Sequence, residues 1–264
     1  MSRSIIVGDI HGCFFTLQAL LKQLSFDASS DCLYCLGDLI GKGRFNEEVL
    51  SFFASLPNKK MVLGNHEISW LRSYIGMSPE REDLLALSRS PKSADWFDFL
   101  KQQPFLIQKD FGFLVHASIA PEWQSSEALA LSGWLSEALS SQPEFFFQKA
   151  HAPDVLRWDP QLPEEDKRFL ALQIFTRCRY YQENGVLALD NTGPPEANLQ
   201  LVPWYMKPRL ISETVWFGHW ASLKGRALER DIHLDGGAVY GGDLIAIDAN
   251  SRQCWRQKRV VEDE

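Results

Sequence analysis

The sequence predicts an α/β protein in which two packed mixed β-sheets are flanked by helices. The first observation is a series of short apolar or β-branched runs, typical of buried strands, at residues 5–7, 33–36, 60–63, 113–115 and 215–217. The second is that every run ends in a turn that carries Asp, Asn or His. Because α/β sheets bind ligands at the carboxyl ends of their strands, we expect these five turns to meet at one edge.

The N-terminal region predicts strand, helix, strand, helix and strand in turn. Apolar residues recur with helical spacing over residues 14–24 and again over residues 47–56, which gives each helix one face for packing on a sheet. Such a series of elements normally forms a right-handed βαβαβ unit. Its three strands would then carry Asp9, Asp38 and Asn65 at their ends.

The remainder predicts an insertion, a cap and a final group of strands. Residues 70–112, approximately, follow a helical pattern, and residues 121–210 are rich in proline and aromatic side chains, which predicts a cap of helices and irregular loops beside the site. Strand patterns return over residues 215–255 and would complete a second sheet packed on the first. We expect one domain over residues 1–264, with the acidic segment 261–264 as a solvated tail.

Composition favours a soluble protein of the cytoplasm. The chain has 264 residues and 45% hydrophobic content, which is enough for a sizeable core. It shows neither an apolar leader nor a run near the ~20 residues that span a bilayer, so we expect no membrane association. Five irregularly spaced cysteines fit a reducing compartment. The net charge of −7 argues against stable DNA binding.

The turns carry the ligand types that hard divalent ions prefer. Carboxylate, amide oxygen and imidazole ligands, with one carboxylate shared, suit a pair of ions that activate water and polarise phosphoryl oxygens. The pattern therefore predicts a two-metal phosphoesterase. Its motifs, in order, are Gly8-Asp9-Ile10-His11-Gly12, Gly37-Asp38-Leu39, Gly64-Asn65-His66-Glu67, Val115-His116-Ala117 and Trp216-Phe217-Gly218-His219-Trp220.

These ordered motifs resemble those of the calcineurin-like metallophosphoesterases, in the phosphoprotein phosphatase branch. A narrower resemblance, to the bacterial symmetrical diadenosine tetraphosphatases, covers nearly the whole chain. It rests on four segments, Val62-Leu63-Gly64-Asn65-His66, Phe175-Thr176-Arg177-Cys178-Arg179, Pro203-Trp204-Tyr205 and Phe217-Gly218-His219-Trp220-Ala221-Ser222-Leu223. The resemblance implies the calcineurin-like metallophosphoesterase fold.

The resemblance also implies an activity. Such enzymes cut dinucleoside tetraphosphates at the middle bridge, so we expect diadenosine 5′,5‴-tetraphosphate to give two ADP through a water activated by two divalent ions. The implied ions are Mn²⁺ or, as the alternative, Co²⁺ or another divalent ion. Removal of nucleoside-tetraphosphate caps from RNA is also implied, which makes capped RNA 5′ ends a second expected partner.

Residue roles follow from the same motifs. The first ion would take Asp9, His11 and Asp38, and the second would share Asp38 and add Asn65, His116 and His219. His66 follows a ligand directly and would protonate the leaving phosphate oxygen as general acid, so that His66 and Asp38 form the catalytic pair. Phosphate oxygens would be bound by Lys42, Arg177 and Arg179.

The prediction that both arginines bind phosphate depends on the conformation of residues 177–179. Side chains two residues apart point to the same face of a strand, so Arg177 and Arg179 would share a face if residues 177–179 form a strand. On a helix they would diverge.

Three residues depart from the patterns of relatives. Lys42 stands where the similar enzymes have arginine, and this exchange is not conservative at a bidentate phosphate site. Gly41 stands where phosphoprotein phosphatases have an aspartate that pairs with the catalytic histidine, which argues against protein phosphatase activity. Ser118 replaces a glycine after His116 and adds a hydroxyl near the metals.

The same motifs are compatible with other functions. One alternative is a broad-specificity metal-dependent phosphoesterase or a protein phosphatase, and another is a catalytically degenerate nucleotide-binding protein. His151, His233 and Asp235 are left outside the predicted site. Aromatic side chains in the cap could stack on nucleobases, although most are expected in the core; they are Trp123, Trp134, Trp158, Tyr180, Tyr181, Trp204 and Tyr205.

Overall fold

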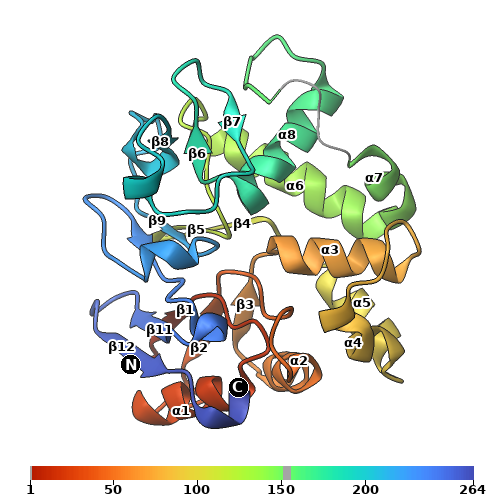
Figure 1. Ribbon diagram of the computed structural model, residues 1–264, viewed down its shortest axis with the longest axis vertical. Helices are drawn as coiled ribbons and strands as arrows, with labels where there is room; N and C mark the ends of the chain where they lie inside the picture. Colours follow the sequence, from red (N-terminus) through yellow and green to blue (C-terminus); the bar gives the residue numbers. More distant parts are fainter. Residues whose placement is uncertain (1, 151–155) are drawn as a thin grey trace.

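Two β-sheets packed face to face form the centre of the protein, and helices cover their outer faces (Figure 1). The structure is a computed structural model and describes residues 2–150 and 156–264. His151, which was left outside the predicted site, lies outside the described residues. The α/β class with two mixed sheets, predicted from the apolar runs, is confirmed.

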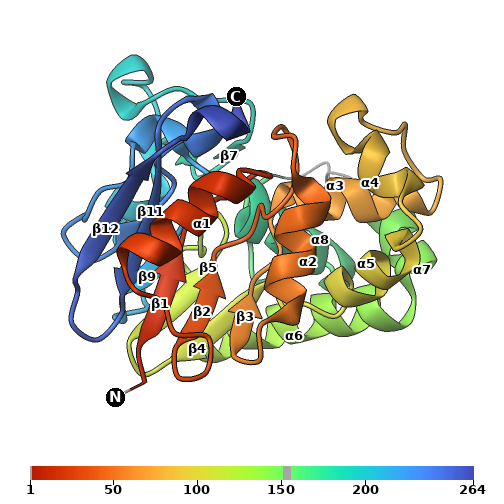
Figure 2. The same ribbon diagram turned by 90° about the horizontal axis from the view of Figure 1, so that it is seen from below.

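The first sheet has the strand order β12-β11-β1-β2-β3. Its parallel half contains the three predicted N-terminal strands, joined by α1 (Phe14–Gln23) and α2 (Asn46–Ser55), which lie side by side over one face of the sheet (Figure 2). The predicted βαβαβ unit is therefore present. The strands are β1 (Ser4–Val7), β2 (Cys32–Cys35), β3 (Lys59–Met61), β11 (Asp243–Asp248) and β12 (Cys254–Lys258).

The sequence predicted that the C-terminal strands complete the second sheet, but only some of them do. Strands β11 and β12 form an antiparallel hairpin that extends the first sheet beside β1, with Ile6 opposite Ile247. The reason is visible in β11, where Leu244 and Ala246 face one side and Ile245 faces the other. A strand that is apolar on both faces is stable inside a sheet between two neighbours.

The second sheet has the order β10-β9-β5-β4. It contains β4 (Leu106–Lys109), β5 (Gly112–Val115), β9 (Val215–Phe217) and β10 (Ile232–His233). Strand β4 lies inside the range where the sequence predicts a helical insertion. It forms a hairpin with β5, with Leu106 opposite Val115, so pairing decides its conformation rather than its local pattern.

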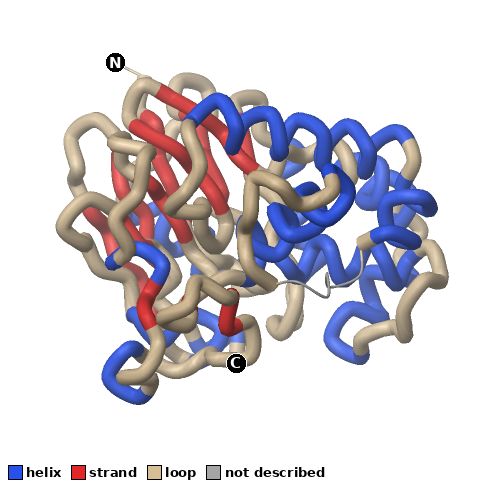
Figure 3. Tube along the Cα trace, turned by 90° about the horizontal axis from the view of Figure 1, so that it is seen from above, coloured by secondary structure: helices blue, strands red, loops and turns tan. Residues whose placement is uncertain are grey.

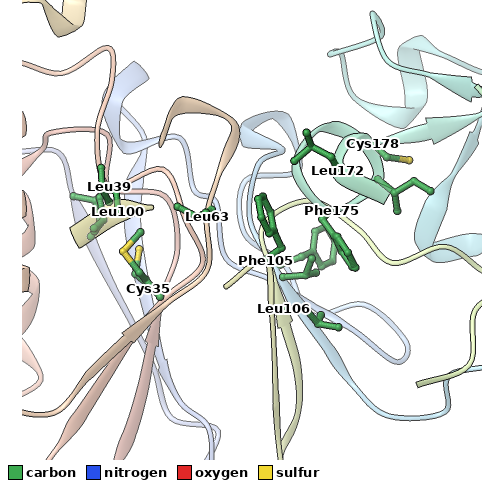
Figure 4. Packing of buried hydrophobic residues seen from close by; sticks show 14 of the residues in the cluster. Cys35, Leu39, Leu63, Leu100, Phe105, Leu106, Leu172, Phe175 and Cys178 are labelled. Atoms are coloured by element: carbon green, nitrogen blue, oxygen red, sulfur yellow. The ribbon is translucent and has the colours of Figure 1, made fainter. Parts of the chain in front are cut away.

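Strand alternation sorts the buried side chains between three layers. Ile6, Leu114 and Trp216 belong to the apolar cluster between the two sheets. Their neighbours on the same strands point the other way and pack under the helices. On the helix side of the second sheet, Phe105 lies beside Phe175 of α8 (Figure 4).

The helices gather on one side of the molecule and most strands on the other (Figure 3). A small third sheet with the order β7-β6-β8 lies above the second sheet (Figure 1). No helix of the described residues is both long and apolar enough to cross a membrane. The further elements are α3 (Asn65–Tyr74), α4 (Leu85–Arg89), α5 (Ser93–Leu100), α6 (Ser125–Ser141), α7 (Pro143–Lys149), α8 (Glu164–Arg177), β6 (Tyr180–Tyr181), β7 (Leu187–Ala188) and β8 (Val202–Pro203).

The sequence predicted a solvated tail for the acidic C-terminal segment, and this prediction is wrong. Asp263 is buried and ends a short helical turn beside α1 (Figures 1 and 2). Its carboxylate accepts hydrogen bonds from the backbone N–H groups of Phe15, at 3.2 Å, and of Thr16, at 2.6 Å. These N–H groups lie in the first turn of α1, where a helix lacks internal partners, so the carboxylate caps the helix from the far end of the chain.

Candidate metal centre and active site

A group of carboxylates, imidazoles and one amide lies where five strands end. The predicted convergence of the five turns is present, because the turns bring ligand atoms within contact distance of one another. Five of the six predicted metal ligands are buried, and Asn65 is partly exposed. Each follows its strand directly: Asp9 and His11 after β1, Asp38 after β2, Asn65 after β3, His116 after β5 and His219 after β9.

Asp38 occupies the middle of this group. Its Oδ2 atom lies 3.6 Å from Nε2 of His11 and 3.4 Å from Nε2 of His116. A second carboxylate approaches the same His11 nitrogen, because Oδ2 of Asp9 lies 3.9 Å from it. One carboxylate thus faces imidazoles from two different sheets, which is the position that a ligand shared by two ions needs.

A second cluster of ligand atoms forms around His116. Its Nε2 atom lies 3.1 Å from Oδ1 of Asn65 and 3.1 Å from Nδ1 of His219. The three side chains come from three separate turns, and all lie next to Asp38 or to a residue that contacts it. An ion placed among them would contact amide oxygen, carboxylate and two imidazoles.

Backbone carbonyls determine which nitrogen of each imidazole is free. His116 Nδ1 donates to the Leu36 carbonyl at 2.8 Å, and His11 Nδ1 donates to the Ile40 carbonyl at 3.2 Å. His219 uses its other nitrogen, because Nε2 lies 3.1 Å from the Arg177 carbonyl. The remaining nitrogens of His11 and His116 therefore present a lone pair to Asp38, and that of His219 presents one to the same group of ligand atoms beside His116, as is usual for metal-binding histidines.

These lone pairs fit a bound cation. The free nitrogens of His116 and His219 face each other, and both acceptor oxygens, from Asn65 and Asp38, point at the same place. Acceptors that face one another without a proton between them repel, and a positive ion converts that repulsion into attraction. Carboxylate, amide oxygen and imidazole are also the donor types that divalent ions such as Mn²⁺ accept.

Burial and mutual repulsion shift the ionisation of these groups. Burial, assisted by Asp235, raises the pKa of Asp38 to about 7, and burial with both neighbouring aspartates raises the pKa of Asp9 well above its usual range. Burial lowers the pKa of His11 to about 3 and that of His116 to about 4. The imidazoles are therefore neutral near pH 7, as metal binding requires, and burial outweighs the opposing effect of Lys42 and Arg81 on Asp38.

The ligand turns also carry unusual backbone conformations. His11, Asp38 and His219 have φ values of 49°, 50° and 63°, in the left-handed region that residues with a side chain seldom adopt. The last of these turns also passes close to Asp9, because a Cβ on Gly218 would lie 1.9 Å from its Oδ1 atom. Such conformations persist where surrounding contacts over-determine the turn, and they are enriched at functional sites.

Asp235 belongs to this site, although it was left outside the predicted one. It is buried and lines the same cavity of about 340 Å³ as His11 and Asp38. The backbone N–H of Gly237 donates to its Oδ1 atom at 2.9 Å, and burial raises the pKa of Asp235 to about 6. The available signal was an Asp-Gly turn after an apolar run, but β10 is only two residues long and is hard to recognise.

His66 differs from the three carbonyl-bound histidines. Its backbone N–H donates to Oδ1 of Asp38 at 2.9 Å, and its ring lies edge-on to His11 with the centroids 4.6 Å apart. Its Nδ1 atom is buried and has no hydrogen-bond partner among the described residues. A Cβ on Gly41 would lie 1.9 Å from this Nδ1 atom, so the ring packs directly on the glycine. The other nitrogen, Nε2, is the one that can reach the cavity.

The three predicted phosphate-binding side chains do not lie together. Lys42 and Arg179 line the cavity of about 340 Å³ that His11 and Asp38 also line, which is called the central cavity below. Nη2 of Arg179 donates to the His219 carbonyl at 2.7 Å. Arg177 lines a neighbouring cavity instead. The condition for a shared face is not met, because Arg177 is the last residue of α8 and Arg179 precedes β6.

Two further sequence-based expectations concern packing. The Ser118 hydroxyl donates to the Ile174 carbonyl of α8 at 2.8 Å, so the extra hydroxyl is satisfied away from the ligands.

Most of the cap aromatics are buried, as expected, and only Trp134 and Tyr205 are partly exposed. The exposed aromatic at the cavity is Tyr240, which the sequence did not single out, and its side chain is 63% exposed.

Known proteins resemble this chain over nearly its full length. The profile of the calcineurin-like phosphoesterase family matches residues 2–186. A protein of Vibrio campbellii named "Bis(5'-nucleosyl)-tetraphosphatase, symmetrical" is 33% identical, with 97% of this chain and 98% of that protein covered. A Vibrio cholerae protein of the same name is 36% identical, with 92% and 93% covered.

A solved structure agrees with these relatives. It is described as the "Crystal structure of a putative diadenosine tetraphosphatase" and superposes with a TM-score of 0.69 at 25% identity, covering 98% of this chain and 94% of that one. The resemblance drawn from the motifs is thereby confirmed. The chain belongs to the calcineurin-like phosphoesterase family, a family of metal-dependent hydrolases, in the group that contains the symmetrical bis(5'-nucleosyl)-tetraphosphatases.

Proposed function

We propose that this protein hydrolyses diadenosine tetraphosphate at its central bridge and releases two molecules of ADP. The observation that carries the proposal is the ring of buried acceptors around Asp38, in a chain whose relatives are named for this reaction. Central cleavage of a substrate with two identical halves leaves two phosphates on each nucleoside.

We further propose that the site holds two divalent ions, with Mn²⁺ as the first choice. When bound, such a pair lowers the pKa of water and polarises phosphoryl oxygens. The first ion would be held by Asp9, His11 and Asp38, and the second by Asp38, Asn65, His116 and His219. Asp235 lies beside Asp9 and Asp38 and adds a further negative charge for the cations.

Positively charged side chains would bind the bridging phosphates. The Arg179 guanidinium is held by the His219 carbonyl, so its remaining N–H groups point from a fixed position at the cavity. Lys42 adds a point charge at the same cavity; its side chain is exposed, and its ammonium contacts the Tyr240 hydroxyl. Both charges oppose the negative charge that develops on phosphoryl oxygens during the reaction.

His66 would supply the proton that the leaving ADP oxygen needs. His66 lines the cavity, and its backbone N–H bond to Asp38 holds the residue next to the proposed metal site. Burial and the neighbouring cationic groups lower the pKa of His66 in the free protein. A bound tetraphosphate brings several negative charges next to the ring and raises that pKa, so protonation accompanies substrate binding.

Gly41 argues against a protein phosphatase. The Nδ1 atom of His66 has no carboxylate partner among residues 2–150 and 156–264. Gly41, which packs on this atom, has no side chain to provide one. The proton-donating histidine therefore lacks the orienting aspartate of the phosphoprotein phosphatases.

Product analysis tests this proposal. Purified protein is incubated with Mn²⁺ and diadenosine tetraphosphate, and the products are separated by ion-exchange chromatography. ADP as the sole product supports symmetrical cleavage. ATP plus AMP would mean that the phosphate register is shifted by one. Hydrolysis of an aryl phosphate without cleavage of diadenosine tetraphosphate would favour a broad-specificity phosphoesterase.

A further inference from the structure

Two larger cavities adjoin the central cavity of the candidate site, and these two share no lining residue with each other. The central cavity, of about 340 Å³, contains the metal-ligand candidates. It shares Ala221, Ser222 and Tyr240 with a cavity of about 530 Å³ on one side. It shares Asn65 with a cavity of about 680 Å³ on the other side. The two outer volumes fall in the ~300–1,000 Å³ range of small-molecule sites.

We propose that each outer cavity binds one nucleoside of the dinucleoside tetraphosphate, while the central cavity holds the bridging phosphates. This inference rests on the proposed function and specifies its substrate contacts. A substrate with two identical halves and a scissile bond at its centre must extend away from the metals in two directions. A cavity on each side of the metal-ligand group meets that requirement, and a single pocket would not.

Tyr240 is the proposed stacking surface of the first arm. Its ring is 63% exposed, and the Lys42 ammonium lies 4.5 Å from its centroid. The ring is carried by the turn Ala238–Tyr240, which is enclosed by Gly237 and Gly241 at φ values of 72° and 84°. An aromatic ring held in a tight turn at the mouth of a cavity can stack on a base with little loss of side-chain freedom.

The charge of the first arm suits a phosphorylated ligand. The outer cavity beyond Tyr240 is lined by Lys224, Arg256 and Lys258, against a single acidic residue, Asp243. The local excess of positive charge contrasts with the net charge of −7 for the whole chain. Positive charge beside an exposed aromatic ring is a combination that binds nucleotides whatever their base, because the charge binds phosphate and the ring stacks on the base.

The second arm lies between α3, α8 and β7. Arg72 of α3 and Arg177 of α8 both line this cavity, and neither forms an ion pair with any described carboxylate. Nε of Arg72 donates to the Met77 carbonyl at 3.2 Å, which leaves the terminal nitrogens of the guanidinium for a ligand. Gln182 and Asn191 add amide groups that can bond to ribose hydroxyls or base edges.

This arrangement gives Arg177 a place in the reaction. It lies outside the central cavity, so it cannot clamp the same phosphate as Arg179. It lines the second arm together with Asn65, the residue that this cavity shares with the central one, so it can bind the outer phosphates of one half. The two arginines then bind successive parts of one substrate, which explains why they diverge.

Paired variants test the two arms. Tyr240→Ala removes the stacking surface, Arg72→Ala removes a charge of the second arm, and Tyr240→Phe keeps the ring. The readout is kcat/KM for diadenosine tetraphosphate divided by kcat/KM for p-nitrophenyl phosphate, which has no nucleoside. We expect the ratio to fall about 10-fold in Tyr240→Ala, because a stacked base contributes ~1–3 kcal/mol. We expect a similar fall in Arg72→Ala, because that variant loses a hydrogen bond from a charged group to the substrate. Tyr240→Phe should stay within about 2-fold of the unaltered protein.

Matched controls remove a similar group elsewhere. Phe145→Ala deletes an aromatic side chain that is 44% exposed, and Arg89→Ala deletes an exposed guanidinium; neither residue lines the three cavities. Both should leave the ratio unchanged. If the ratio also stays unchanged in Tyr240→Ala and Arg72→Ala while ADP is formed, the arms are wrong and the proposed function stands.

A different result separates the two proposals. If the unaltered protein hydrolyses the aryl phosphate but not diadenosine tetraphosphate, the proposed function fails. Inhibition of aryl phosphate hydrolysis by diadenosine tetraphosphate then becomes the readout. Inhibition weakened about 10-fold in Tyr240→Ala and Arg72→Ala would support the arms as nucleoside-binding sites, and equal inhibition in all variants would overturn them.

Discussion

At the scale of single residues, hydrogen bonding separates ligand-like histidines from the proposed acid. His11, His116 and His219 each give one ring N–H to a backbone carbonyl, which fixes the ring and frees one lone pair. His66 has no such bond among the described residues. A ring that must gain and lose a proton is better left without a fixed hydrogen-bond donor role. The difference in hydrogen bonding therefore fits metal binding by the first three histidines and proton transfer by His66.

This distinction predicts different losses for two substitutions. His66→Ala should lower kcat by about 10²- to 10⁴-fold, the usual contribution of a general acid, while bound Mn²⁺ stays at the level of the unaltered protein. Asp38→Ala should lower kcat and the amount of bound Mn²⁺, since Asp38 lies between the two groups of ligand atoms. Turnover and metal content, by plasma mass spectrometry, check this. Full activity in His66→Ala would rule out the general-acid role.

Lys42 gives a second prediction for a single residue. Lys42→Arg should preserve or raise activity on tetraphosphates by up to about 10-fold, because a guanidinium binds phosphate with two bonds where the ammonium acts as a point charge. Lys22→Arg, at an exposed position of α1, is the matched control. Steady-state kinetics provides the test. A large loss in Lys42→Arg would show that the contact between Lys42 and Tyr240 requires lysine.

At the scale of elements, the C-terminus stabilises the first helix. Asp263→Ala removes the acceptor for two backbone N–H groups of α1 and for the Thr16 hydroxyl at 2.6 Å. We expect a loss of about 1 kcal/mol in the free energy of unfolding, as for an ordinary helix cap. Urea denaturation measures it. Glu262→Ala, at an exposed neighbouring position, should change stability by less than ~0.5 kcal/mol.

Pairing partners explain which elements the sequence could predict. The five strands that carry ligands are recognisable because apolar runs precede Asp, Asn or His in a turn. Strand β4 was missed and β11 was assigned to the wrong sheet, since their positions depend on distant partners, β5 and β1. Local patterns identify a strand, but they contain no information on which edge it joins.

The candidate site shows the same limit. All six predicted ligands come together, because each motif places its side chain at the end of a strand. Asp235 was left outside the predicted site and Tyr240 was not singled out, since their proximity arises from a loop that returns to the site after β10. Arg177 and Arg179 could not be placed, because their separation depends on where α8 ends.

At the scale of the whole molecule, the two-sheet core concentrates negative charge at one edge. Asp9, Asp38 and Asp235 are all buried there, and each has a raised pKa with burial as the largest cause. Carboxyl groups of this kind bind cations in competition with protons. The metal-free protein should therefore respond strongly to pH.

The expected direction follows from the raised pKa of Asp38. Its folded value of about 7 lies above the ~3.9 of an unfolded chain, so the protonated form stabilises the metal-free fold, and that contribution is lost as pH rises to about 7. Mn²⁺ affinity should rise about 10-fold per pH unit below 7 for one released proton, and then level off. Titration calorimetry between pH 5.5 and 8 checks this, and a flat profile would contradict it.

The most direct test of the whole account is a Mn²⁺ titration of the metal-free protein, followed by electron paramagnetic resonance and by ADP formation in the same samples. We expect two ions per chain, a spin-coupled signal from ions that share Asp38, and ADP formation only when both are bound. Asp38→Asn should abolish the coupling. A single bound ion, or ADP formation in chelator-treated protein, would contradict the account.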